Sequence, residues 1–129
     1  MPRWFLAMAL LLAAPAARAQ DPTGPIAVGQ LLCGALVVDS FYNTVRSDGR
    51  RSEVGYMMQL RNTTGQQRDF LVTFTHQGAL DALRRSQQRL QARQSLTLQL
   101  GREMLANPAG AGALSPQHDV PGLVRITCG

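Results

Sequence analysis

Few residues in the chain could perform catalysis. His76 and His118 are the two histidines, and His118 is followed by Asp119 and preceded three positions earlier by Ser115. A serine, a histidine and an aspartate together suggest a hydrolase. No nucleophile motif surrounds Ser115, however, and a polar pair in an exposed loop explains the same residues. We therefore predict that the protein is not an enzyme, with hydrolysis through His118 as the last-ranked alternative.

Metal and cofactor chemistry has equally few candidate residues. Thioether sulfurs suit Cu(I), but Met57 and Met58 are consecutive and would point to opposite faces of a strand. The acidic residues are scattered, and the chain has neither a phosphate-binding loop nor a dinucleotide fingerprint. We expect no cofactor and no bound metal.

One group of arginines concentrates the positive charge. The formal net charge is +5, and all thirteen basic residues are arginine. Arg84, Arg85, Arg89 and Arg93 could contact an anionic surface or another protein of the cell envelope, although a solvated face is the competing interpretation. We do not expect nucleic acid as a partner, because this cluster lacks the interleaved aromatic residues on which bases stack.

The first residues predict export. Arg3 precedes an apolar run over residues 4–14, and a motif of small residues ends at Ala19. This pattern is typical of a secretory signal peptide over residues 1–19. A membrane anchor is the alternative, but a spanning helix needs about 20 apolar residues. We expect a bacterial protein that is periplasmic or secreted and has no membrane span after cleavage.

Two cysteines, Cys33 and Cys128, lie near the ends of the remaining chain. In an oxidising compartment an even pair predicts a disulfide bond. A bond that closes a loop of roughly 95 residues stabilises the fold by about 4–5 kcal/mol in the chain-entropy model.

Alternating apolar residues predict two strands between residues 53 and 75. A period of two is typical of a strand with one buried face. Turn residues at 62–65 separate the runs, and we predict an antiparallel hairpin around them. The expected inward positions are Val54, Tyr56, Met58 and Leu60 in the first run, and Phe70, Val72 and Phe74 in the second.

The flanking segments suggest further strands. Proline and glycine make residues 20–30 a flexible lead-in, and residues 31–129 are the expected domain. Gly34 and Asp39 could each mark a bulge or a break in the run that follows. The remaining expectations are a turn over 47–50, a strand over 95–100 that could continue past a bulge, a long loop over 107–122 and a last strand over 123–128.

Residues 79–92 have two interpretations. Apolar residues at roughly helical spacing, with arginines four positions apart, favour a short helical turn. The alternative is an irregular crossover connection that contains a short strand.

The central pattern resembles bacterial immunoglobulin-like domains. Such domains have a strand that ends in Asn plus a small turn, as at Asn62, and a next strand that passes to the other side. A later corner of the form leucine-x-x-glycine-x-serine is similar to Leu90 through Ser95, with Arg93 at the usual glycine. CARDB-like adhesion modules and the first domain of periplasmic pilus chaperones are similar. The matching segments are residues 58–65, 70–74, 89–90 and 94–98.

This resemblance implies an antiparallel immunoglobulin-like β-sandwich in an exported setting, and it implies no activity. Together with the scarcity of catalytic residues, it favours a non-catalytic binding or accessory module of the bacterial cell envelope. The alternative is a small structural subunit or assembly chaperone of a surface structure. In either case an exposed strand edge would be the natural contact for a partner.

Overall fold

The computed structural model describes residues 25–129. The predicted signal peptide, residues 1–19, and the first part of the lead-in lie outside the described residues. The strands are β1 (Leu31–Leu32), β2 (Leu36–Ser47), β3 (Ser52–Asn62), β4 (Arg68–Phe74), β5 (Ser86–Leu90), β6 (Ser95–Leu105) and β7 (Val124–Cys128), with one 3-10 helix, η1 (Val120–Leu123), before β7.

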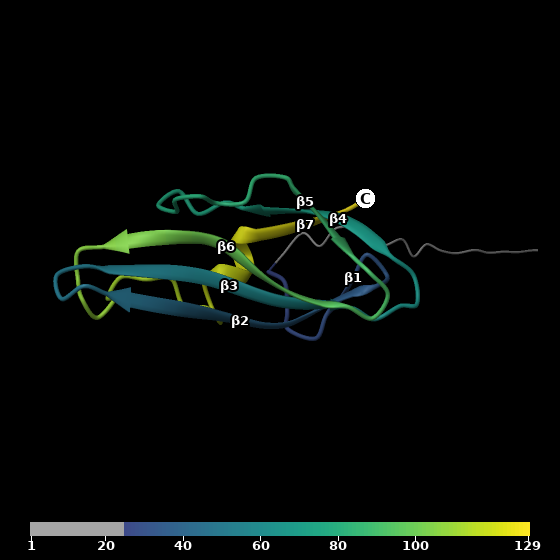
Figure 1. The fold of residues 1–129 in the computed structure, drawn as a ribbon, viewed down its shortest axis with the longest axis horizontal. Coiled ribbons are helices and arrows are strands. Elements are labelled where there is room, and N and C mark those ends of the chain that lie inside the picture. Colours follow the sequence, from purple (N-terminus) through teal and green to yellow (C-terminus); the bar gives the residue numbers. More distant parts are fainter. Residues whose placement is uncertain (1–24) are drawn as a thin grey trace, which may run out of the picture.

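The strands form two antiparallel sheets that pack face to face (Figure 1). One sheet has four strands in the order β1-β2-β3-β6, and the other has three in the order β5-β4-β7. Their inner faces share one apolar core, to which both sheets contribute fully buried side chains. The expected fold class is confirmed as an all-β antiparallel sandwich with one disulfide. Its short helical turn is η1 and not the segment 79–92 in which the sequence predicted one.

The alternation in the sequence matches the buried faces. Every predicted inward side chain of β3 and β4 is at most 2% exposed, including Phe74, whereas Thr73 beside it is partly exposed. Met58 is buried and Met57 is partly exposed, so the two sulfurs point to opposite faces, as expected.

The predicted hairpin between β3 and β4 is wrong, because the two strands belong to different sheets. The connection crosses from one sheet to the other, as the resemblance implied. Asn62 holds this crossing: its buried side chain donates to the carbonyls of Gln66 and Gln91, and its oxygen accepts from the Thr64 amide. Turn residues stop a strand locally but do not specify its next partner, which explains the error.

The segment 79–92 is a crossover connection and not a helical turn. Leu80 forms an isolated bridge with Arg102, and β5 follows. The Phe74 amide donates to the Leu83 carbonyl, and the Leu83 amide donates to the Leu100 carbonyl. The backbone thus pairs with both sheets, which leaves these groups unavailable for helical hydrogen bonds.

Bulges shape the two long outer strands. The pairing of β2 with β3 shifts between Val38 and Ser40, so Asp39 is the extra residue. The pairing of β3 with β6 shifts opposite Leu100, after which β6 continues to Leu105. The sequence pattern indicated both irregularities.

The predicted disulfide is present. Cys33 and Cys128 are joined, with Cα atoms 5.6 Å apart and 95 positions between them in sequence. The bond ties the end of β7 to the turn between β1 and β2. Among residues 25–129, no helix is long and apolar enough to cross a membrane.

The corner between β5 and β6 contains an unfavourable backbone conformation. Arg93 has φ = 63°, in the left-handed region that glycine adopts without steric cost. Its amide donates to the Thr64 carbonyl, and its side chain is exposed. Arg93 therefore adopts a conformation that glycine would adopt without steric cost, at the position where the resembled corner motif usually has glycine.

We predict that Arg93→Gly raises the free energy of unfolding by about 1 kcal/mol, because glycine removes the left-handed strain. Arg93→Ala is the matched control: it removes the same side chain but keeps a Cβ, and it should not stabilise. Urea unfolding of the three proteins measures the difference. Equal stability of the Gly and Ala variants would contradict the prediction.

Candidate functional site

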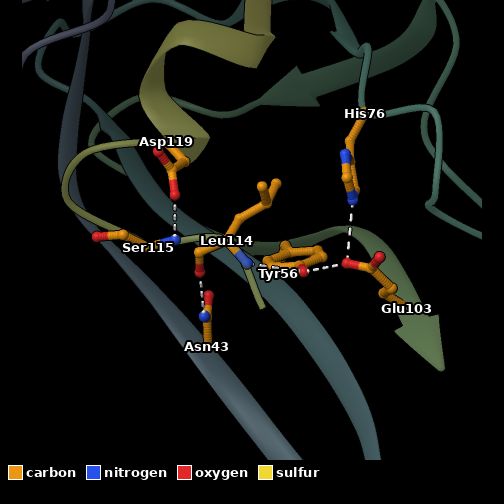
Figure 2. Close-up of polar contacts among 7 residues, drawn as sticks. All are labelled: Asn43, Tyr56, His76, Glu103, Leu114, Ser115 and Asp119. Atoms are coloured by element: carbon orange, nitrogen blue, oxygen red, sulfur yellow. Dashed lines mark hydrogen bonds and ion pairs between the residues drawn. The ribbon is translucent and has the colours of Figure 1, made fainter. Parts of the chain in front are cut away.

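The long sheet extends beyond the short one, and a loop covers its inner face. This covering loop, residues 106–119, joins β6 to η1. Three hydrogen bonds attach it: Ser52 Oγ donates to the Asn107 carbonyl (2.7 Å), Asn43 Nδ2 donates to the Leu114 carbonyl (2.8 Å) and the Leu114 amide donates to the Tyr56 hydroxyl (3.1 Å). Figure 2 shows the contacts around Leu114.

A cluster of polar side chains lies beneath this loop, and we call Asn43, Tyr56, His76 and Glu103 the polar clasp (Figure 2). The Tyr56 hydroxyl donates to Glu103 Oε1 at 2.5 Å, and His76 Nε2 lies 3.0 Å from the same oxygen. A carboxylate only accepts, so the imidazole donates through Nε2. Tyr56 belongs to β3, Glu103 to β6 and His76 to the segment after β4, so the clasp joins both sheets and the loop.

A glycine permits the close approach of these groups. A Cβ at Gly78 would lie 2.8 Å from Glu103 Oε2 and 3.2 Å from His76 Nε2. Any side chain at this position would therefore press against the carboxylate–imidazole pair.

The clasp changes the titration of its members. Burial, followed by the hydrogen bond to Glu103, raises the pKa of Tyr56 to about 12. For Glu103, burial alone would raise the pKa, but the hydrogen bonds from Tyr56 and His76 outweigh it, and the net pKa of this carboxyl is lowered. The clasp is thus most stable with a neutral phenol and an ionised carboxylate.

The second cluster tests the hydrolase hypothesis. Ser115, His118 and Asp119 do come together, but in a local turn: Asp119 Oδ2 accepts from the Ser115 amide (2.8 Å), and the His118 amide donates to Ser115 Oγ (3.2 Å). The Asp119 carboxylate and the Ser115 hydroxyl thus contact backbone amides. In the described part of the chain, neither group forms a hydrogen bond with the His118 ring. These contacts are those of a capped loop turn.

His118 also lines a pocket, which we call the edge groove. It measures about 420 Å³ and lies between residues 25–28, residues 39–41 of β2 and the segment before η1. Most of its lining is apolar, and Val28 within it is 59% exposed. The apolar contributors are Pro25, Ile26, Ala27, Val28, Phe41, Pro116 and Pro121.

A free strand edge runs along this groove. β1 pairs with β2 only at Leu36 and Val37, so the outer edge of β2 beyond that point has no neighbouring strand in the described part of the chain. The Asp48 amide donates to the Arg51 carbonyl at the closing turn. Residues of an antiparallel strand alternate between those whose backbone groups bond the neighbouring strand and those whose backbone groups face away from it. Because Asp48 is bonded, the backbone groups of the even-numbered residues in the distal half of β2 face β3, and those of the odd-numbered residues face outward.

The predicted arginine cluster is divided in the structure. Arg84 and Arg85 precede β5, Arg89 lies within it and pairs with Asp69 (3.0 Å), and Arg93 lies at the corner beyond its other end. All four side chains are exposed. They therefore do not form a single basic stripe.

Sequence reasoning missed two groups of residues. Arg125 pairs in register with Thr73, whose hydroxyl accepts from the Arg85 amide, but no local pattern links residues as far apart in sequence as Thr73 and Arg125. The sequence pattern predicts Tyr56 only as a core residue and Glu103 only as one of several scattered acidic residues, so it does not bring the two together. A Tyr within an apolar run was the available signal, since a buried hydroxyl requires a partner.

Comparison of the chain with protein-family models, curated proteins and solved structures gave no match. Within residues 25–129, no group of three or more His, Cys, Asp or Glu side chains is placed to hold a metal ion.

We predict that Tyr56→Phe lowers the free energy of unfolding by about 1–3 kcal/mol, because it leaves the Leu114 amide and Glu103 without their shared partner. Tyr42→Phe is the control. The Tyr42 hydroxyl has no recorded hydrogen bond among the described residues, so the loss should stay within about 0.5 kcal/mol. Chemical denaturation measures both variants, and equal losses would contradict a role for the clasp.

The lowered pKa of Glu103 predicts a pH dependence. A carboxyl with a folded-state pKa below its usual 4.5 contributes stability above that pH and loses it as pH falls through the folded value. The stability difference between wild type and Glu103→Gln should therefore shrink between about pH 6 and about pH 3. Urea titrations across this range measure it, and a constant difference would refute the prediction.

Proposed function

We propose that the protein is an exported, non-catalytic binding or accessory module of the bacterial cell envelope, and that it holds an extended segment of another envelope protein by strand addition. The free edge of β2 beside the edge groove is the observation that carries this proposal. An added strand would pair with the outward backbone groups of β2 and place alternate side chains toward the groove.

The chemistry of the groove favours an apolar segment. Ile26, Phe41 and the prolines present carbon atoms, while Asp39 at the rim is paired with Arg61 at 2.9 Å. A charged side chain of a partner would lose its hydration in the groove without meeting an unpaired residue of opposite charge there. The proposed partner is therefore an extended chain with apolar residues at alternating positions.

Two further features support the exported setting. The predicted signal peptide over residues 1–19 would direct the chain out of the cytoplasm, and a disulfide persists in oxidising compartments. The immunoglobulin-like resemblance, to CARDB-like modules and pilus-chaperone domains, agrees with an accessory role in the envelope.

A proline on the β2 edge tests the proposal. Val45 is 55% exposed, and its amide faces outward, so Val45→Pro removes a donor that an added strand needs while leaving the pairing with β3 intact. Used as bait in envelope extracts, the wild type and Val45→Thr should retain the same partner, and Val45→Pro should lose it. Retention by all three baits would contradict strand addition at this edge.

A second variant tests the groove alone. Val28→Asp places a charge on an exposed groove position and should also abolish retention, with little change in thermal midpoint. Light scattering of the purified protein checks the alternative role as a structural subunit. Concentration-dependent assembly that Val45→Pro prevents would identify a second copy as the added strand and would refute the proposal of a different partner.

A further inference from the structure

A second polar site lies on the outer face of the three-stranded sheet, away from the edge groove. Thr73 of β4 is its centre. Arg125 of β7 is the register partner of Thr73 on one side, and on the other the Arg85 amide donates to Thr73 Oγ1 at 3.1 Å. Opposed residues in neighbouring strands have Cβ atoms about 5 Å apart, so arginines from two elements flank one threonine.

A pocket opens beside this threonine. It measures about 310 Å³, and Thr73 and Arg84 both line it. The other polar lining residues are Thr75, His76 and Gln77, which present hydroxyl, imidazole and amide groups. Thr75 already donates to the Leu123 carbonyl and His76 to Glu103, so the Gln77 amide and the Thr73 hydroxyl are the neutral groups that can donate to an oxyanion.

The arginines around Thr73 are not neutralised. Arg84, Arg85 and Arg125 are exposed, and none has an ion pair among residues 25–129. The neighbouring acids already have partners. Glu103 accepts from His76 and Tyr56, and Asp81 pairs with Arg102 at 2.8 Å, so the site has an uncompensated positive charge.

We propose that this site binds a phosphate group, held by Arg84 and Arg125 above Thr73. Guanidinium groups bind phosphate oxygens through paired, charge-assisted hydrogen bonds. Three unpaired arginines match the several oxygens of a tetrahedral phosphate group better than the two oxygens of a carboxylate. Of the aromatic rings that line the pocket, Phe74 is only 2% exposed and His76 is held by Glu103. Neither offers an open face on which a base could stack, so the ligand is a phosphate group and not a nucleobase. The proposal stands independently of the edge groove.

Phosphate titration tests the proposal. Isothermal titration of the full mature chain with inorganic phosphate should show saturable binding at constant ionic strength. The double variant Arg84→Gln/Arg125→Gln should weaken it by about tenfold or more, the scale of losing charged hydrogen bonds. Arg89→Gln/Arg93→Gln is the matched control, because it removes two charges outside the site, and its affinity should stay within about twofold of wild type.

The comparison with Arg89→Gln/Arg93→Gln separates phosphate binding at this site from a general effect of net charge. The proposal would be overturned if the wild type showed no saturable phosphate binding. It would also be overturned if both double variants weakened binding equally, since that result would mean that only the net charge of the protein matters. Sedimentation with vesicles of phosphatidylglycerol, and of phosphatidylcholine as the uncharged reference, distinguishes the source of the phosphate. Anionic-vesicle binding that Arg84→Gln/Arg125→Gln abolishes identifies a lipid headgroup, and phosphate binding without vesicle binding identifies a soluble phosphate. Thermal midpoints equal to wild type exclude misfolding.

Discussion

The unequal length of the two sheets is the constraint on which the rest of the structure depends. The long strands β2, β3 and β6 have 12, 11 and 11 residues, whereas β4, β5 and β7 have 7, 5 and 5. The inner face beyond the short sheet would meet water without another cover. A loop supplies that cover, but it brings backbone groups that need partners. The polar clasp satisfies them, which is why Tyr56 and Glu103 replace apolar residues at the end of the core.

The same inequality leaves one side of the sandwich open. β7 has no further neighbour in the described sheet, and the disulfide ties it to the turn that precedes β2. The free edges of β2 and β7 therefore lie on the same side. Ile26 is buried there, and its amide donates to the Pro121 carbonyl, so the chain before β1 fills part of the gap. The edge groove is the part that remains unfilled.

Local sequence patterns predicted the strands, the disulfide and the inward face of Phe74, because side-chain alternation and cysteine pairing follow from short-range chemistry and compartment. They failed where the answer depended on which sheet a strand enters, as at Asn62, or on backbone bonds from distant strands, as at Leu83. The edge groove, the clasp and the position of Arg125 beside Thr73 all require residues far apart in sequence to meet. Period and composition indicate which face of a strand is buried, but they do not indicate which distant residues lie beside it.

The position of the disulfide also has a mechanical consequence. Cys33 and Cys128 enclose nearly every strand, so tension applied to the chain before Cys33 and after Cys128 would pass through the covalent sulfur–sulfur link. The hydrogen-bonded sheets between them would carry almost none of that load. A domain built this way can be pulled from both ends without unravelling the strands that lie between the two cysteines.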